Sequence, residues 1–254
     1  MKYLYILILL TGCQEVAINN DKIIVASATN SQYALDKPDK VYEMPSQLNE
    51  ISGICFLNEK EILCHEDENG KIYTYNIADN KVTSTTDFGP AGDYEDIDRF
   101  KDKTYIVRSD GVLFSVSGKE TAELKTSIPE GENIEGLCAD AANNRLLLAS
   151  KKKGKIYAYE PGAGQAKELW MIDEKKFAPS ALAIHPVTKE IYVISSAGKQ
   201  LIILSADGKI KGSHQLISKY FIQPEGMAFA ANGDLYISNE GRSGKGNILL
   251  FRYR

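Results

Sequence analysis

Apolar and polar residues alternate in short runs from about residue 50 to the end of the chain, and these runs recur in a fixed order. The stretch from Ile134 to Glu160 is one such unit, with an acidic residue, a small residue and apolar runs separated by turns. Alternation with a period of two predicts β-strands. Five such units follow one another, so the sequence predicts a repeat protein.

The spacing of the units is typical of propeller blades. When one position near the start of each unit is aligned, the steps between units are 43, 40, 45 and 45 residues. A period in the forties built from short strands predicts four-stranded blades around a central channel. The aligned positions are Ser52, Glu95, Glu135, Ser180 and Glu225. The strands predicted for the first four units are 53–57, 61–66, 71–76 and 81–87; 97–100, 103–108, 112–116 and 123–128; 137–141, 145–150, 155–159 and 167–172; and 182–185, 190–195, 200–205 and 209–216.

The last unit is one strand short, with predicted strands at 227–230, 234–238 and 247–253. The alternating run from Lys40 to Met44 precedes the first full unit and is the spare strand. We predict that it closes the last blade, which removes two open sheet edges and joins the two ends of the chain. The fold class is therefore all-β, a five-bladed β-propeller closed by an N-terminal strand. A sixth blade built around Ile23 is the alternative.

Composition is consistent with a single folded domain. The chain has 254 residues, of which 43% are hydrophobic and 25% are charged, and its formal net charge is −4. These values are ordinary for a soluble globular protein. The run Lys151-Lys152-Lys153 is too short to form a surface that follows a phosphate backbone, so we expect no nucleic-acid partner.

The first residues resemble a bacterial lipoprotein signal. Lys2 precedes an apolar run, and the tetrad Leu10-Thr11-Gly12-Cys13 places small residues before a cysteine. The run is too short to span a bilayer. We therefore expect a signal peptide at residues 1–12, acylation of Cys13 by chains such as palmitate, a tether at 13–39 and the propeller at 40–254. The protein would then be a lipoprotein on a bacterial cell-envelope membrane, on the periplasmic side or at the cell surface.

Two rings of side chains are predicted to share one mouth of the channel. The first strand of each blade lines the channel, so the five aligned residues form an inner ring. The second strands end on the same face. Their last residues add a second ring, from which the predicted binding residues are Asp67, Arg108, Lys151, Asn239 and Glu240.

Glu95, Glu135 and Glu225 are the predicted metal ligands in the inner ring. Carboxylates that converge on a narrow channel repel one another unless a cation, a proton or a basic side chain lies between them. Carboxylate and serine oxygens suit calcium, which accepts irregular oxygen cages. Alternatively, each glutamate caps a neighbouring strand, and Arg108 and Lys151 neutralise the ring.

The remaining chemistry-bearing residues do not form a predicted site. His65, His185 and His214 fall in different columns of the alignment, so no zinc pattern results. Cys55 and Cys64 would face each other across a tight hairpin, and a disulfide there is the alternative to free thiols. We expect free buried thiols, because a bond between directly opposed strand residues is strained. No nucleophile elbow or phosphate-binding glycine loop is present, and no catalytic residue is assigned.

The unit openings resemble the SdiA-regulated family of bacterial envelope proteins. The resemblance rests on the openings Asn49 to Ile54, Asp93 to Ile97, Asn133 to Leu137 and Gln223 to Met227, with the ending Gly233 to Glu240. It covers about residues 40 to 254 and implies a five-bladed propeller in the cell envelope without an established catalytic activity. The units are more distantly similar to NHL-type, phytase-like and gluconolactonase-like propellers, some of which hold calcium at the channel mouth.

Three functions follow as hypotheses. The first is a lipid-anchored propeller that binds a ligand or an envelope protein at the channel mouth, with calcium as the candidate cofactor. The second is a metal-dependent hydrolase of a phosphate ester or lactone, although Ser52 and Ser180 interrupt the acidic ring that such enzymes use. The third is an envelope scaffold that docks proteins on its outer blade surfaces.

Overall fold

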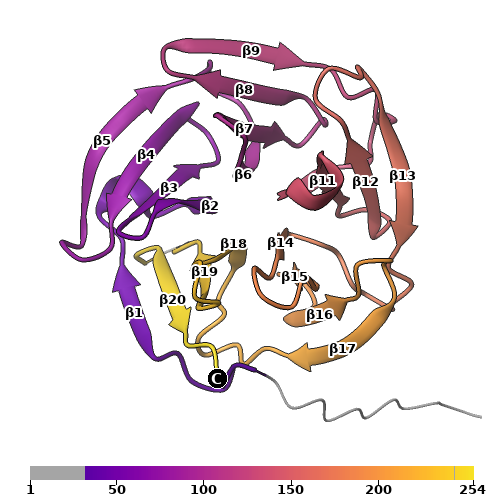
Figure 1. Cartoon of the computed structure of the whole chain (residues 1–254). Helices are drawn as coiled ribbons and strands as arrows, with labels where there is room; N and C mark the ends of the chain where they lie inside the picture. Colours follow the sequence, from indigo (N-terminus) through magenta and orange to yellow (C-terminus); the bar gives the residue numbers. More distant parts are fainter. Residues whose placement is uncertain (1–31, 243) are drawn as a thin grey trace, which may run out of the picture.

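Five four-stranded antiparallel sheets stand in a ring around a central channel in the computed structural model, which describes residues 32–242 and 244–254 (Figure 1). The predicted signal peptide, Cys13 and most of the predicted tether lie outside the described residues. Blade 1 contains β2 (Ile51–Asn58), β3 (Glu61–Glu66), β4 (Lys71–Asn76) and β5 (Lys81–Asp87). Blade 2 contains β6 (Tyr94–Phe100), β7 (Lys103–Arg108), β8 (Leu113–Ser117) and β9 (Glu120–Leu124). Blade 3 contains β10 (Ile134–Asp140), β11 (Arg145–Ser150), β12 (Lys155–Tyr159) and β13 (Ala166–Met171).

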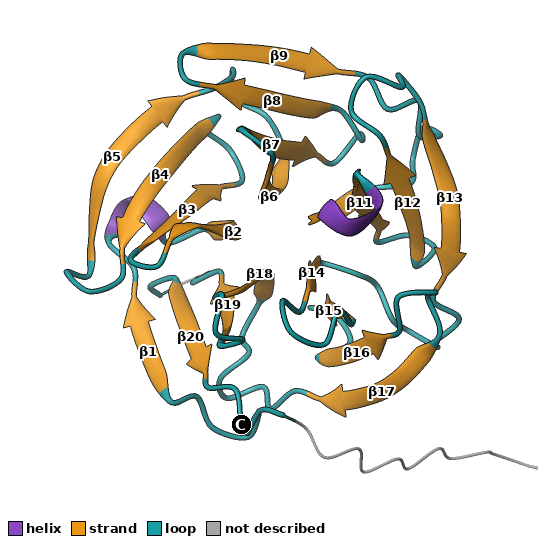
Figure 2. Cartoon of the chain, in the orientation of Figure 1, coloured by secondary structure: helices purple, strands orange, loops and turns teal. Residues whose placement is uncertain are grey.

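The last two blades complete the ring. Blade 4 contains β14 (Ala181–Ile184), β15 (Ile191–Ser195), β16 (Gln200–Leu204) and β17 (Ile210–Gln215). Blade 5 contains β18 (Pro224–Phe229), β19 (Leu235–Asn239), β20 (Asn247–Phe251) and β1 (Lys40–Glu43). Figure 2 shows that the only helical segments drawn among the described residues are short turns, the 3-10 helices Ser46–Leu48 and Ala141–Asn143.

The predicted closure is confirmed. The strand β1 pairs antiparallel with β20, with Lys40 opposite Leu250 and Glu43 opposite Asn247. The side chain of Tyr42 is buried against Tyr236, with ring centroids 6.3 Å apart. The N-terminal strand therefore supplies both the missing ladder of hydrogen bonds and part of the core between blades 5 and 1. The described residues form five sheets, and the region around Ile23 that would have made a sixth lies outside them.

The inner strands of each blade are more buried than the outermost strand, and this difference explains the hydrophobic pattern along each repeat unit. In blade 1, β3 has five buried residues in a row, whereas six of the seven residues of β5 are exposed. Inner strands are covered on both faces by neighbouring blades and therefore read as nearly continuous apolar runs, and outer strands read as polar ones.

Two differences from the predicted strands have physical causes. The strand β9 begins at Glu120 rather than at residue 123, because Gly118, with a φ of 59°, forms a two-residue turn directly after Ser117. This Gly-Lys hairpin was not recognised in the sequence. The first strands of the blades also begin up to three residues before their predicted starts, because their first residues bulge out of the ladder and break the alternation.

The packed body includes residues from the predicted tether. Tyr33 and Leu35 are only 3% and 8% exposed and belong to the core cluster between blades 4 and 5. The Tyr33 hydroxyl donates a hydrogen bond of 2.6 Å to the carbonyl oxygen of Gly233, and its ring contacts those of Tyr192 and Tyr253. The segment before β1 is thus held against the side of the propeller.

Neighbouring first strands approach so closely that small residues are required between them. A Cβ added to Gly53 would lie 2.7 Å from the Asp96 Cα, and one added to Gly226 would lie 2.5 Å from the Ser52 carbonyl oxygen. Asp96 occupies the same column in blade 2 and is 1% exposed. Its carboxylate accepts hydrogen bonds from the backbone N–H groups of Ile97, at 2.9 Å, and Leu137, at 2.8 Å, which joins blade 2 to blade 3.

The cysteines within the propeller are free and buried, as predicted. The expectation that Cys55 and Cys64 face each other was wrong. In the register between β2 and β3, Cys55 lies opposite Leu63 and Cys64 lies opposite Ile54. The two thiols therefore point to opposite faces of the blade, where they belong to different core clusters.

Candidate functional site

A β-bulge at the start of the first strand presents the inner-ring residue to the channel mouth. The register shifts across Glu95 in β6, across Glu135 in β10 and across Glu225 in β18. In β2 a shift spans Ser52. A bulge redirects the side chain of the extra residue, so the same irregularity in four blades turns these residues toward a common centre.

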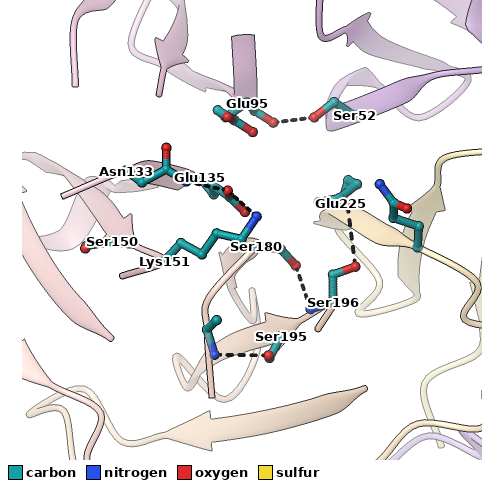
Figure 3. A network of polar contacts seen from close by, with 12 residues as sticks. Ser52, Glu95, Asn133, Glu135, Ser150, Lys151, Ser180, Ser195, Ser196 and Glu225 are labelled. Atoms are coloured by element: carbon teal, nitrogen blue, oxygen red, sulfur yellow. Dashed lines mark hydrogen bonds and ion pairs between the residues drawn. The ribbon is translucent and has the colours of Figure 1, made fainter. Parts of the chain in front are cut away.

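The predicted glutamates are brought together in one cavity. A cavity of about 270 Å³ at the channel mouth is lined by side chains from four blades, and Figure 3 shows Glu95, Glu135 and Glu225 around its centre. Seven of the lining residues are carboxylates and one is a lysine. The lining residues are Glu50, Ile51, Ser52, Asp67, Asp93, Glu95, Asn133, Glu135, Lys151, Gln223, Glu225 and Glu240.

Burial, together with the charges of neighbouring carboxylates, raises the pKa values of several acidic residues in this cavity. Burial, followed by the charge of Glu135, raises the pKa of Glu95 to about 9. Burial, again followed by Glu135, raises the pKa of Glu225 to about 7. Burial also raises the pKa of Asp67 to about 6. Without a ligand, the cavity therefore holds protons at neutral pH, and a bound cation would displace them.

Lys151 is the counter-charge of the acidic cavity. Its ammonium lies 2.5 Å from Oε1 of Glu135, which also accepts a hydrogen bond of 2.8 Å from the Asn133 side chain (Figure 3). Glu135 is 4% exposed, and burial raises its pKa against the opposing effect of Lys151. Lys151 pairs with Glu135. In the described part of the chain, Glu95 and Glu225 therefore have no basic partner within ion-pair distance.

The two inner-ring serines join blades together. The Ser52 hydroxyl donates a hydrogen bond of 2.5 Å to the carbonyl oxygen of Glu95 in blade 2. The Ser180 hydroxyl donates one of 2.9 Å to the carbonyl oxygen of Pro224 in blade 5. Both residues line the mouth, but their hydroxyl protons are directed at the neighbouring blade. Their predicted role in ligand binding stays a prediction.

The predicted second ring divides into residues that reach the mouth and residues that do not. Asp67, Lys151 and Glu240 line the acidic cavity. The guanidinium of Arg108 instead pairs with Asp110 at 2.8 Å, outside the cavity. Asn239 is fully buried, and its amide donates to the side chain of Asn247 at 3.1 Å. Strand pairing and a nearby carboxylate thus direct these last two side chains away from the channel.

Four polar residues of the mouth were missed in the sequence. They lie two positions before the inner ring and are Glu50, Asp93, Asn133 and Gln223. The alignment of the units could have predicted these residues, because the column is polar in four units, and only the fourth unit, with Ala178, has an apolar residue there. These residues directly precede the first strands of their blades and line the same cavity as the inner ring. The column therefore belongs to the same mouth as the ring.

A second cavity of about 370 Å³ adjoins the first and has the opposite charge. It shares Lys151, Gln223 and Glu225 with the acidic cavity. Lys199 and Arg242 line its outer part, and Glu225 is its only carboxylate. The Ser196 hydroxyl reaches Oε1 of Glu225 at 3.4 Å (Figure 3). The mouth thus has an acidic half and a basic half, with Glu225 in both.

The described residues contain no group of three His, Cys, Asp or Glu side chains already arranged to hold a metal ion. A metal at Glu95, Glu135 and Glu225 therefore requires the carboxylates to move together as they lose their protons. In the same part of the chain, no helix has the length and apolar character needed to cross a membrane.

The ring of five four-stranded blades defines the molecule as a five-bladed β-propeller, and its channel mouth is polar and charged. The chain belongs to the SdiA-regulated family, which matches residues 43–242. No curated protein matches the sequence.

Several solved structures are similar to this chain in fold. A glutaminyl cyclase from Myxococcus xanthus superposes with a TM-score of 0.60 at 14% identity, covering 85% of this chain and 95% of that one. A streptogramin B lyase gives a TM-score of 0.55 at 10% identity, with 84% and 97% covered. A luciferin-regenerating enzyme gives 0.53 at 11% identity, with 85% and 95% covered. At these identities the likeness is one of fold alone.

Proposed function

We propose that the protein is a lipid-anchored envelope propeller that binds a cationic ligand at its channel mouth, with calcium as the first candidate. The observation that supports this proposal most directly is the convergence of Glu95, Glu135 and Glu225 from three blades on one cavity with a single lysine. The lipid anchor at Cys13 is the second part of the proposal, and it concerns a residue outside the described ones.

The acidic half suits a hard cation better than the alternative of strand capping. A capping carboxylate accepts backbone N–H bonds, as that of Asp96 does. The carboxylate of Glu135 instead takes the Lys151 ammonium and the Asn133 amide. The carboxylate of Glu225 accepts hydrogen bonds from the side chains of Ser196 and Gln223. Carboxylate and amide oxygens around a polar cavity are ligands that calcium accepts, with water completing the shell.

A calorimetric titration of calcium into the protein tests this proposal. We expect saturable binding with a Kd of about 10⁻⁴ to 10⁻³ M, the range of extracellular calcium modules. The affinity should rise from pH 6 to pH 8, because Glu95 and Glu225 must lose protons to bind the ion. The double variant Glu95→Gln, Glu135→Gln should lose the binding.

The matched control is Glu130→Gln, which removes an exposed carboxylate outside both cavities. It should bind calcium as the natural protein does. If the natural protein gives neither heat nor a thermal shift with calcium, the metal proposal is wrong. The search would then turn to proteins that dock on the outer strands of the blades.

A hydrolase is the second candidate, because two neighbouring carboxylates have different charged partners: Glu135 contacts the Lys151 ammonium, whereas Glu95 has no ion-pair partner among the described residues. The raised pKa of Glu95 keeps it protonated, whereas the Lys151 ammonium favours the ionised form of Glu135. Such a pair can serve as general acid and general base. We expect an enzyme to turn over aryl phosphates or lactones, and Glu135→Gln to lower kcat about 100-fold or more without lowering Tm. Equal activity in the variant would exclude this role.

A further inference from the structure

The basic half of the mouth holds two cations, Lys199 and Arg242, that form no ion pair with the described residues, although the charge of Glu225 acts on Lys199 and that of Glu240 on Arg242. Lys199 donates a hydrogen bond of 2.5 Å to the carbonyl oxygen of Ile222, and Arg242 donates to the side-chain oxygen of Gln223. Neither cation lies within ion-pair distance of a carboxylate of the described chain, although Glu225 lines the same cavity. Burial and the charge of Arg242 lower the pKa of Lys199. An anion at this place would relieve the repulsion.

The two halves lie side by side and share three lining residues. Glu225 and Lys151 line both, so an acidic and a basic region meet within one opening. A simple cation would neutralise the acidic half but would be repelled by Lys199 and Arg242. A simple anion would neutralise the basic half but would be repelled by the carboxylates of the acidic half. A ligand with both charges satisfies both halves at once.

We infer that the mouth binds a small zwitterion, with its ammonium group among Glu95 and Glu225 and its carboxylate against Lys199 and Arg242. This inference rests on the proposed cation-binding function and specifies its ligand. The Ile222 side chain is 46% exposed and lines the basic half, where it offers an apolar contact to a side chain of the ligand. A dipeptide with a free amino terminus, a free carboxylate and one apolar side chain has these three features.

Glycyl-leucine is the probe, and two derivatives remove one charge each. The ethyl ester keeps the ammonium and lacks the carboxylate, and the N-acetyl form keeps the carboxylate and lacks the ammonium. We expect calorimetry on the full chain to detect glycyl-leucine in the millimolar range or better. Each derivative should bind at least about tenfold more weakly, the loss expected for one charge-assisted hydrogen bond.

The double variant Lys199→Gln, Arg242→Gln separates this inference from the proposed function. It should bind glycyl-leucine about tenfold more weakly than the natural protein does. It should bind calcium as well as before or better, because it removes two positive charges from beside Glu225. The variant is thus expected to weaken dipeptide binding without weakening calcium binding.

The outcomes that overturn the inference are specific. Equal binding of glycyl-leucine and its ethyl ester would show that the carboxylate is not recognised, and absence of binding at about 10 mM would exclude the dipeptide class. If calcium binds and depends on Glu95 while glycyl-leucine does not bind, the proposed function stands and the zwitterion is wrong. If neither calcium nor glycyl-leucine binds, both the proposed function and the zwitterion inference are wrong.

Discussion

A chain that begins at Pro45 is expected to lose cooperative unfolding, because it lacks the strand that closes the ring. The strand β1 supplies the outer ladder of blade 5, and the side chains of Tyr42 and Met44 are 6% and 2% exposed in the core between blades 5 and 1. Burial of two such side chains contributes about 3–6 kcal/mol. That is a large part of the roughly 5–15 kcal/mol by which domains are stable.

Thermal unfolding followed by circular dichroism measures this effect, and a chain that begins at Gln32 is the matched control. The control should retain a single sharp transition because it keeps every described contact. A chain that begins at Asp36 should melt lower than the control, because it keeps β1 but lacks the buried side chains of Tyr33 and Leu35. Equal Tm values for the chains from Gln32 and from Pro45 would contradict the closure of the ring by β1.

The variant Glu95→Gln is expected to be more stable than the natural protein at pH 8 and equally stable near pH 4. Burial raises the pKa of Glu95 in the folded state to about 9, well above that of an unfolded chain. Between these two values the folded protein binds a proton that the unfolded chain releases, so each increase in pH costs stability. A glutamine cannot ionise, and the variant does not incur this cost.

The size of the effect follows from the same linkage. One pH unit of differential protonation corresponds to about 1.4 kcal/mol, so the interval from the ordinary pKa of 4.5 to pH 8 sets an upper limit of about 5 kcal/mol. Glu135, Asp93 and Lys151 share the electrostatic environment of Glu95, and we expect about 2–4 kcal/mol. Urea unfolding at pH 4 and pH 8 provides the measurement.

The exposed Glu130→Gln variant is again the control, and its stability should differ little from that of the natural protein at either pH. A destabilised Glu95→Gln protein at pH 8 would mean that the ionised carboxylate makes a favourable contact in the folded state. The acidic cavity would then be interpreted as a structural network of ionised side chains, and not as a protonated site that releases its protons when a cation binds.

The sequence by itself determined the architecture. A period in the forties, the two-residue alternation and the missing strand of the last unit predict five blades and their closure, because each blade must bury its faces against its neighbours. The same alignment places Glu95, Glu135 and Glu225 on one face of the ring. These features are local or periodic, and a linear pattern can carry them.

The tertiary structure alone decided which side chains share the site. Arg108 and Lys151 both lie at the ends of second strands and were predicted to share the mouth, but Asp110, two residues away, holds Arg108 outside while Lys151 reaches Glu135. The basic half of the mouth depends on the loops between the second and third strands of blades 4 and 5, which differ in length, so that Lys199 and Arg242 have no common column. The strand pattern determines the backbone position from which a side chain projects. The ion pairs and hydrogen bonds that the side chain makes with residues distant in sequence determine the position of its charged group.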